Sequence, residues 1–279
     1  MIEDKIRIAV LGDLHGHINL ALSILKDCEQ FNNFNFDSIL QVGDLGYFPD
    51  LSNIDKATLR FAEKDYEELG FQDFLQETQI SKKLFFDEKT KISSDLVFIA
   101  GNHEDIENLR ILEFSTNKSP IPVDHYGKIL YLPPGEIYEI NKGKLKIKIA
   151  GLGGVSDKSE GYHFTKMDIR KARSLNKIDI LLTHEPHSGA IENRGSQEVK
   201  DLLKLIQPDY HFCGHLHKGE RLSSFGKTES YLLDQVGFRK RHKLNDKCIG
   251  VLKITEINKT FSYLDGDWLK KYKKNNYSL

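Results

Sequence analysis

Two histidines, His215 and His217, stand one residue apart in the stretch Gly214-His215-Leu216-His217, directly after an apolar run. Side chains alternate between the two faces of a strand, so residues two apart can point the same way. Two neutral imidazoles on one side are ligands for a metal ion, although an isolated pair is often only surface polarity. The metal interpretation therefore depends on whether the rest of the chain supplies more ligands.

Four other apolar runs also end in polar clusters that contain metal-binding side chains. In chain order, the five clusters are Gly12-Asp13-Leu14-His15-Gly16, Gly43-Asp44, Gly101-Asn102-His103-Glu104, Thr183-His184 and Gly214-His215-Leu216-His217. In layered α/β proteins, loops beyond the C-terminal ends of strands hold ligands, because side chains from separate strands converge there. We therefore expect the five clusters to form one site.

Seven side chains in these clusters suit metal coordination: Asp13, His15, Asp44, Asn102, His184, His215 and His217. Two Asp, one Asn and four His favour Mn or Fe, with Zn or Ni as alternatives, over Ca or Mg, which prefer shells made only of oxygen. Seven ligands are too many for one ion and suit two divalent ions if one carboxylate bridges them. Asp44, alone at its strand end, is the expected bridge.

Two ions held about 3.5–4 Å apart bind a phosphoryl group and lower the pKa of a bound water that can attack phosphorus. His103 is left outside the ligand set, and we expect it to be the catalytic residue that protonates the leaving oxygen or stabilises its charge. Glu104, next to it, is a candidate for orienting the His103 ring.

Residues near these ligands are candidates for substrate contacts. Aromatic side chains there could stack on a base, although ordinary packing is an equally good explanation for each. The candidates are His17, Tyr47, Phe48, Tyr162 and His163.

Short apolar runs alternate with segments of helical period, and they predict the elements that position the site. The runs expected to be strands are 6–11, 38–42, 96–100, 146–150, 178–182 and 210–213, followed near the C-terminus by 231–233, 248–254 and 260–264. Helices are expected around 21–28, capped by Asn19, and around 199–206, capped by Ser196 and ended by Pro208. Helices between the first strands but not the last predict an α/β protein with a mixed sheet or two packed sheets.

Residues 51–94 separate two of the polar clusters by more than a simple connection needs. Leu59, Ala62, Tyr66 and Leu69 recur at helical spacing, so we expect a helical insertion that forms a lid or substrate wall. The chain of 279 residues is otherwise expected to form a single domain.

The composition, with 39% hydrophobic and 29% charged residues and a net charge of -1, is that of a soluble protein without general attraction to polyanions. The basic clusters at 238–243 and 270–274, the latter in a tail of about 268–279, are expected to be a solvated turn and a solvated tail. Cys28, Cys213 and Cys248 are far apart, which disfavours disulfides and thiolate zinc sites and favours the cytoplasm. We expect no signal peptide and, without 18 consecutive apolar residues, no membrane span. No obligate protein partner is evident.

The order GDLHG, GD, GNHE, H and GHLH resembles the calcineurin-like metallophosphoesterase superfamily over roughly residues 6–217. The resemblance implies a four-layer α/β/β/α sandwich, in which two mixed β-sheets are flanked by helices. It also implies a division of the ligands. Asp13, His15 and His217 bind one ion, Asn102, His184 and His215 bind the other, and Asp44 bridges the two.

Two branches of the superfamily can be compared with the chain. In the protein serine/threonine phosphatases the second motif continues into Asp-Arg-Gly, whereas here Gly43-Asp44 continues into Leu45-Gly46. The layout is similar to that of the RNA lariat debranching enzymes in GNHE, in residues 151–156 and in the stretch from Ser196 to Phe212. Those enzymes carry Cys where Asp13 stands.

Three functions follow from these observations. The first is a metal-dependent phosphoesterase that cleaves a phosphodiester in a nucleotide or in nucleic acid such as RNA. The second is the same chemistry on a phosphomonoester, in a nucleotide-like metabolite or a phosphoprotein. The third, a scaffold whose site has decayed, would require a lost ligand, and all seven expected ligands are present.

Overall fold

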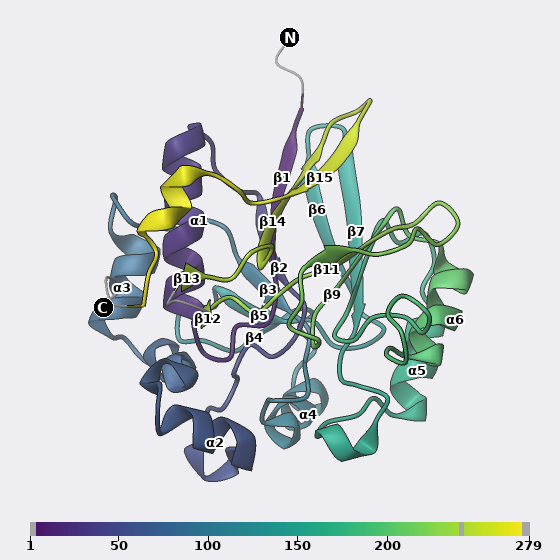
Figure 1. Ribbon diagram of the computed structural model, residues 1–279, viewed down its shortest axis with the longest axis horizontal. Coiled ribbons are helices and arrows are strands. Elements are labelled where there is room, and N and C mark those ends of the chain that lie inside the picture. The colour runs from purple at the N-terminus through teal and green to yellow at the C-terminus, as the bar shows by residue number, and fades with distance from the viewer. Residues whose placement is uncertain (1–3, 240–242, 275–279) are drawn as a thin grey trace.

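The computed structural model describes residues 4–239 and 243–274. Two sheets pack face to face, α1 and α3 lie beyond one of them, and α5 and α6 lie beyond the other (Figure 1). The arrangement is the expected four-layer sandwich, which is therefore confirmed.

The first sheet has seven strands. The pairs β1–β2, β2–β3 and β3–β5 are parallel, and the other three pairs of neighbouring strands are antiparallel. In spatial order they are β15 (Lys259–Tyr263), β14 (Ile249–Ile254), β1 (Ile6–Leu11), β2 (Ser38–Gln41), β3 (Leu96–Phe98), β5 (Ile129–Tyr131) and β4 (Ile121–Pro122). Leu11 pairs with Gln41, and Gln41 with Phe98, so the three strands that precede the first three polar clusters end at the same level.

The second sheet has six strands and is also mixed, with antiparallel strands at its two edges. In spatial order they are β10 (Glu220–Arg221), β11 (Glu229–Leu232), β9 (Tyr210–Cys213), β8 (Ile180–Thr183), β7 (Leu145–Leu152) and β6 (Ile137–Lys142). A two-stranded ribbon of β12 (Phe238–Arg239) and β13 (Lys243–Leu244) stands apart.

The central strands are mostly apolar because both of their faces are buried. On β1, Ile8 and Val10 pack between the sheets against residues such as Phe212, while Ala9 and Leu11 belong to the cluster under the helices. This double burial explains why the sequence shows these strands as continuous apolar runs.

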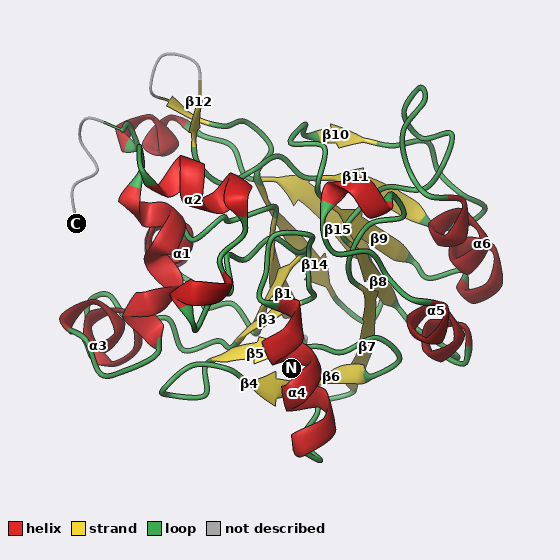
Figure 2. Ribbon diagram, turned by 90° about the horizontal axis from the view of Figure 1, so that it is seen from below, coloured by secondary structure: helices red, strands yellow, loops and turns green. Residues whose placement is uncertain are grey.

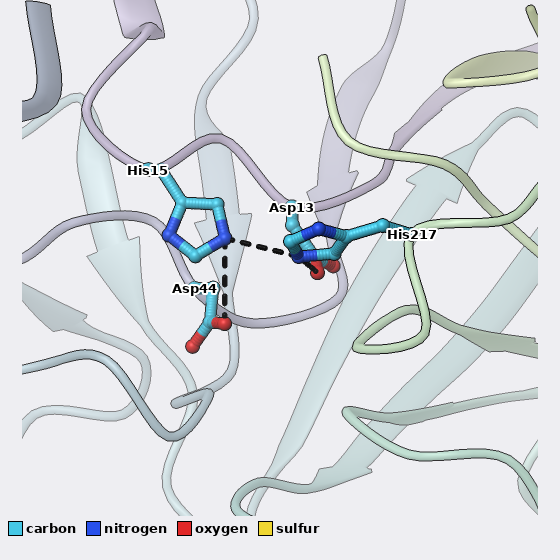
Figure 3. Close-up of side chains that lie close together, drawn as sticks. All are labelled: Asp13, His15, Asp44 and His217. Carbon is cyan, nitrogen blue, oxygen red and sulfur yellow. Dashed lines mark hydrogen bonds and ion pairs between the residues drawn. The ribbon is translucent and has the colours of Figure 1, made fainter. Parts of the chain in front are cut away.

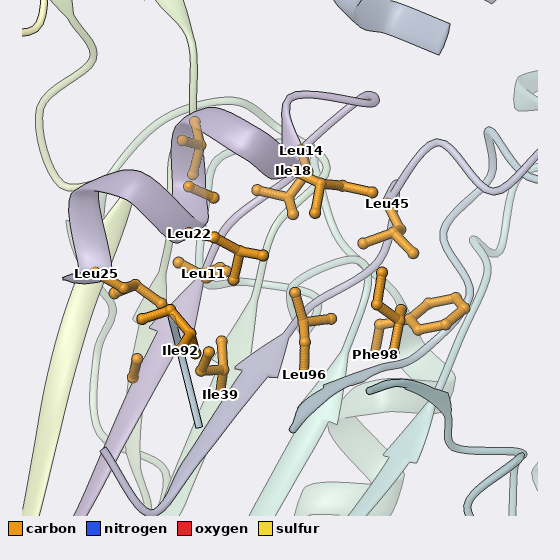
Figure 4. Packing of buried hydrophobic residues seen from close by; sticks show 14 of the residues in the cluster. Leu11, Leu14, Ile18, Leu22, Leu25, Ile39, Leu45, Ile92, Leu96 and Phe98 are labelled. Carbon is orange, nitrogen blue, oxygen red and sulfur yellow. The ribbon is translucent and has the colours of Figure 1, made fainter. Parts of the chain in front are cut away.

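Helix α1 (Ile18–Asn32) packs on the outer face of the first sheet. Figure 4 shows Ile18, Leu22 and Leu25 of this helix against Leu11 of β1 and Ile39 of β2. The prediction that Asn19 caps the helix is wrong, because the helix begins at Ile18 and already includes Asn19. The Asn19 side chain instead donates to Asp73 at 3.1 Å and ties the helix to the insertion.

Helices α5 (Lys166–Arg173) and α6 (Gln197–Ile206) cover the second sheet, where Leu202 and Leu203 pack near Leu181 of β8. The predicted cap of α6 is confirmed, since the amide of Val199 donates to the Ser196 hydroxyl at 3.2 Å. Gln207 then adopts a left-handed conformation and ends the helix before Pro208.

Residues 51–94 contain two α-helices, α2 (Lys56–Ala62) and α3 (Gln79–Phe86), and 3₁₀ helices at Leu51–Asn53 and Tyr66–Phe74. The predicted apolar stripe is not the buried face, because Leu59 and Tyr66 are 50% and 78% exposed. Phe71 and Phe74 instead reach the core beside α1, so local spacing pointed to the wrong side of the insertion.

Helices α2 and α4 (Ile106–Ser115) lie near the end of the molecule at which β1, β2 and β3 finish. Figure 2 views the molecule from this end. A 3₁₀ helix at Asp267–Lys271 lies beside α1, where the rings of Trp268 and Phe31 stack with their centroids 6.0 Å apart. Lys271 and Lys274 pair with Asp27 and Asp65. Residues 240–242 of one basic cluster and 275–279 of the tail lie outside the described residues.

The three cysteines are buried and free. Within the part of the chain that the structure describes, none of the helices has both the length and the apolar composition needed to cross a membrane.

Candidate metal centre

The two sheets bring the predicted ligands to one edge of the sandwich. Asp13, Asp44 and Asn102 follow β1, β2 and β3 of the first sheet, while His184 and the pair His215 and His217 follow β8 and β9 of the second. The site therefore lies across the seam between the sheets, and neither sheet alone supplies it.

Four of the ligands form a tight group (Figure 3). The Nε2 atoms of His15 and His217 lie 3.2 Å apart, Nε2 of His217 lies 3.0 Å from Oδ2 of Asp13, and Nε2 of His15 lies 3.6 Å from Oδ2 of Asp44. One donor atom from each of Asp13, His15, Asp44 and His217 falls within 4.8 Å of every other, close enough to surround a single ion.

A second group meets the same carboxylate from the other side. Nε2 of His184 lies 3.3 Å from Oδ2 of Asp44 and 2.9 Å from Oδ1 of Asn102. The rings of His184 and His215 are 5.1 Å apart between their centroids. Oδ2 of Asp44 thus faces both groups, as a bridging ligand would.

The donor atoms fit divalent metal ions. Nδ1–H of His184 donates to the carbonyl of Val42 at 3.0 Å, which leaves Nε2 as a ligand atom towards the site, an arrangement typical of metal-binding histidines. Asp13 and Asp44 are 0% and 1% exposed. Among the described residues, the groups at ion-pair distance from these two carboxylates are imidazoles. Two buried carboxylates that face imidazoles are a natural site for cations.

The protonation of the site follows from its burial and its charges. Burial disfavours the charged form of Asp44, but the neighbouring His184 outweighs it and holds the pKa of this carboxyl well below its ordinary value. Burial lowers the pKa of His15 to about 4 against the opposing effect of Asp44, so its ring is neutral, as metal ligation requires.

Four ligand residues hold backbone conformations that side chains rarely adopt. His15, Asp44, His215 and His217 have φ angles of 42°, 56°, 68° and 46°. Left-handed conformations of this kind cost of order 1–3 kcal/mol each and cluster at functional sites. They turn each side chain into the site directly after its strand.

Two glycines allow the backbone to approach the carboxylates. A Cβ atom on Gly101 would overlap Oδ1 of Asp44, and one on Gly214 would overlap Oδ1 of Asp13. At these two positions a residue without a Cβ atom is needed for the close approach of the backbone to a carboxylate.

The match to known proteins decides the family. Residues 6–219 match the calcineurin-like phosphoesterase family, well over half of the chain. The chain belongs to the calcineurin-like phosphoesterase family. The resemblance seen in the order of the motifs is confirmed.

The relatives include enzymes named for lariat debranching. The lariat debranching enzyme of Drosophila melanogaster is 23% identical over 252 residues, which cover 76% of this chain and 42% of the relative. That of Mus musculus is 25% identical over 312 residues, covering 94% of this chain and 52% of the relative. The chain thus spans about half the length of these relatives. A solved structure with 12% identity superposes with a TM-score of 0.53, covering 94% of this chain and 100% of the other, and shows the fold alone.

In this member of the family, His103 stands beside the candidate metal ligands without joining either of the two groups. Its ring centroid lies 5.6 Å from that of His15, and its backbone amide donates to Oδ1 of Asp44 at 2.8 Å. Nδ1–H of His103 donates to Oδ2 of Asp55 at 3.1 Å. Burial lowers the pKa of His103, but the bond to Asp55 and the nearby charge of Asp44 raise it to about 9.

Asp55 was missed by sequence reasoning, although its local role has a sequence signal. It caps α2 by accepting the amides of Ala57 and Thr58 at 2.8 and 3.0 Å, as an Asp before a helix often does. A cap says nothing about contacts elsewhere in the chain, so the pairing with His103 could not be read from the sequence.

Glu104 does not orient His103. Its carboxylate accepts the amides of Leu45 and Gly101, each at 2.5 Å, and so joins the loops that carry Asp44 and Asn102. The adjacent side chains face apart, and the predicted role of Glu104 towards His103 is corrected accordingly.

The predicted substrate contacts lie elsewhere. Tyr47 and Phe48 are each 2% exposed, and the Tyr47 hydroxyl donates to Asn108 at 2.6 Å, so neither ring has a face for a base. The Tyr162 hydroxyl accepts a bond from Arg110 at 2.6 Å. His163 pairs with Val155 in an isolated β-bridge.

His17 is also directed away from the ligands. Its Nδ1–H points to the Leu14 carbonyl at 3.1 Å, and Nε2 lies 3.8 Å from Asp65 and 3.6 Å from Glu67 of the insertion. These acidic neighbours were too distant in the chain to be foreseen.

The cleft that opens over the ligands has a volume of about 840 Å³, and none of the five predicted contacts is part of the lining that the structure describes. The lining is formed by Asp55, Lys56, Ala57, Asn102, His103, Ser159, Gly161, Ile191, Arg194, His215, Leu216 and Lys218.

Proposed function

We propose that the chain is a dinuclear metal-dependent phosphoesterase that hydrolyses phosphodiester bonds in nucleotides or nucleic acid. The observation that carries the proposal is the position of Asp44, whose Oδ2 atom faces His15 on one side and His184 on the other. Asp13 and His217 would complete one metal site, and Asn102 and His215 the other. Mn or Fe suits this donor set, with Zn or Ni as alternatives.

Two divalent ions bound here would lower the pKa of an attacking water and neutralise charge on the phosphoryl oxygens. The chain's own contribution is to fix the seven ligands on rigid strand ends and to keep Asp13 and Asp44 out of water. Buried, prepositioned groups need no reorganisation during the reaction.

His103 is the proposed general acid. Because Nδ1–H is held by Asp55, Nε2 is the atom left to deliver a proton to the leaving oxygen. The residue lines the cleft beside Asn102 and His215, which places its ring where a substrate would lie. Asp55 acts through His103 and is a positioning residue.

Two observations favour a diester over a monoester. The cleft of about 840 Å³ exceeds what one phosphate group fills, leaving room for a second substituent on phosphorus. The similar lariat debranching enzymes are named for a nucleic-acid substrate, which supports RNA or a nucleotide as the partner molecule. Buried, free cysteines are compatible with the proposed cytoplasmic location.

One panel tests the proposal. Metal-depleted protein is resupplied with Mn, Fe, Ni or Zn and assayed against para-nitrophenyl phosphate, bis-para-nitrophenyl phosphate and a labelled RNA. Faster cleavage of the bis ester or RNA supports the diesterase, and faster cleavage of the monoester supports a phosphomonoesterase. No turnover with any metal would contradict both and favour a non-catalytic scaffold.

Asp44→Asn tests the bridge in the same assay. The loss of the bridging carboxylate should abolish turnover while the circular dichroism spectrum stays that of the wild type. Turnover close to the wild-type level in this variant would exclude a bridging role for Asp44.

A further inference from the structure

The two basic clusters of the sequence, at 238–243 and 270–274, meet in the folded chain. Lys243 of β13 pairs with Lys273 in an antiparallel β-bridge. The ribbon of β12 and β13 therefore lies beside the yellow C-terminal segment (Figure 1). Like charges repel one another, so bringing lysines from two distant segments together costs free energy that a bound anion would offset.

A pocket of about 300 Å³ opens between these segments, and we call it the lysine pocket. Four lysines line it: Lys243, Lys247, Lys270 and Lys273. Lys270 pairs with Asp267 at 2.5 Å, and the ammonium of Lys247 lies 5.7 Å from the centroid of the Tyr263 ring. The ion pairs formed among the described residues do not include Lys243, Lys247 or Lys273. Their positive charges are available to an anion in the pocket.

Two carboxylates in the lining do not balance the lysines. Oδ1 of Asp265 accepts the amide of Gly266 at 2.6 Å, and Asp246 is exposed. Four lysines against two aspartates leave a surplus of two positive charges in the described lining. The surplus is local, since the whole chain has a net charge of -1.

The buried side of the lysine pocket is apolar. Ile249 is 2% exposed, and Leu264 and Leu269 pack against the same core cluster as α1. Tyr272 adds an aromatic side chain to the lining. A small inorganic anion needs no such surface, whereas a nucleoside monophosphate has both an anionic group and a planar base that can stack on an aromatic ring. The volume lies at the lower end of the range for small-molecule sites, which suits one nucleotide rather than a longer chain.

The lysine pocket is separate from the candidate metal centre. Its described lining shares no residue with that of the cleft over the ligands. Gly219 follows the cleft residue Lys218 and packs against Lys247 so closely that an added Cβ atom would overlap the Cβ atom of Lys247. A ligand in the pocket would therefore lie beside the cleft without contacting the metal ligands.

We propose that the lysine pocket is a second ligand site, which binds a nucleoside monophosphate. The phosphate contacts Lys243, Lys247 and Lys273, because lysine binds phosphate as a point charge. The base lies on the apolar side, next to Tyr272. Binding at this site needs neither the metal ions nor the hydrolytic reaction, so it does not depend on the proposed function.

The only tryptophan of the chain provides a local signal for the test. Trp268 lies on the same 3₁₀ helix as Leu269 and Lys270, which line the pocket. Uridine monophosphate is titrated into the metal-loaded full chain, and tryptophan fluorescence is excited at wavelengths where uracil absorbs little. We expect a saturable change with the nucleotide. Uridine should bind at least about tenfold more weakly, because it lacks the charge-assisted contacts, and inorganic phosphate should also bind more weakly, because it lacks the base.

Substitutions in the lining assign the signal to the pocket. Lys243→Ala and Lys273→Ala should each weaken binding of uridine monophosphate about tenfold, and the double variant should abolish the saturable change. Leu269→Glu, which places a carboxylate on the apolar side, should abolish it as well. Lys118→Ala is the matched control, because Lys118 is exposed on the loop after α4 and lies outside the described lining. It also removes one positive charge and should leave the affinity unchanged.

The absence of a saturable change in the wild type, or wild-type affinity in the double lysine variant, would overturn the inference. Uridine or inorganic phosphate that binds as tightly as the nucleotide would overturn the assignment of a nucleotide as the ligand. Hydrolysis of bis-para-nitrophenyl phosphate, measured on the same proteins, tests the proposed function separately and should stay at the wild-type level in the lysine variants. Circular dichroism of each variant identifies any loss of binding that comes from misfolding.

Discussion

Asp55 has two tasks at the residue scale, since it caps α2 and accepts the hydrogen bond from Nδ1 of His103. The first task needs only an acceptor oxygen, which asparagine also offers. The second depends on charge, because a carboxylate favours the protonated ring and an amide does not. The two tasks can therefore be separated by one substitution.

Asp55→Asn should lower kcat about tenfold or more for esters with a poor leaving group and much less for para-nitrophenyl esters, which need no proton on the leaving oxygen. The unfolding midpoint should change little, because the cap is kept. Asp50→Asn, which alters the cap of the preceding 3₁₀ helix, is the control. An equal loss with both classes of leaving group would assign Asp55 a structural role only.

Seven candidate ligands and the proposed general acid His103 could be proposed from residue type and spacing, because each follows an apolar run that was predicted to be a buried strand. The contacts made by Glu104 and His17 could not. Their partners, Leu45 and Glu67 among them, are brought close only by the packing of the insertion and of neighbouring loops.

At the scale of elements, the loops after β1, β2 and β9 are shaped by the site rather than by local preference. Their ligands adopt left-handed conformations that their side chains disfavour, and glycines let the next loop pass within contact distance. Sequence showed glycines beside ligands, but not which of them faces a carboxylate of another loop.

Gly214→Ala should weaken metal binding more than it weakens the fold. The added methyl group would meet the Asp13 carboxylate and displace it, at a cost of about 1–3 kcal/mol for overpacking. Metal affinity measured by competition with a chelator should fall at least tenfold. Gly237→Ala is the control, because the nearest atom to its Cβ would be Nε2 of Gln235 at 3.7 Å. An unchanged metal affinity of Gly214→Ala would mean that the loop can accommodate the added methyl group without moving Asp13.

The strands of the second sheet also contain a titratable group away from the site. His211 on β9 is 0% exposed, its Nε2 lies 2.8 Å from the Thr183 hydroxyl and its Nδ1 lies 3.2 Å from that of Ser230. Burial lowers the pKa of His211 to about 3, so the ring stays neutral in the folded protein.

Below about pH 6.5 the unfolded chain binds a proton at His211, whereas the folded chain does not. The contribution of His211 to the free energy of unfolding is therefore complete above pH 6.5 and is lost as the pH falls towards 3. Between these two pH values the free energy of unfolding changes by up to about 1.4 kcal/mol per pH unit. His211→Gln should be less stable at pH 7.5 but lose less stability between pH 7.5 and 5, measured by urea unfolding of metal-free protein. Parallel pH profiles for the two proteins would contradict this expectation.

At the scale of the whole molecule, the sandwich explains why the site needs both sheets. The parallel strands of each sheet end at the same edge, and face-to-face packing through Val10, Ile149 and Phe212 fixes the distance between the two sets of ligands. The alternation of strands and helices predicted the class of fold, and the motif order predicted its four layers.

Short strands and contacts between residues far apart in the chain could not be predicted from the sequence. Strands β5 and β6 were not predicted, because Ile129–Tyr131 is only three residues long and Ile137–Lys142 mixes apolar with charged residues at an edge. The cations of the cleft, Lys56 and Arg194, lie far apart in the chain and are joined only by the fold.

The central claim is that Asp44 bridges two metal ions, and anomalous diffraction from crystals of the manganese-loaded protein tests it most directly. A bridging Asp44 should give two peaks about 3.5–4 Å apart on either side of its Oδ2 atom. One should lie near His15 and His217, and the other near His184 and Asn102. A single peak in fully active protein, or two peaks that Asp44 does not touch, would contradict it.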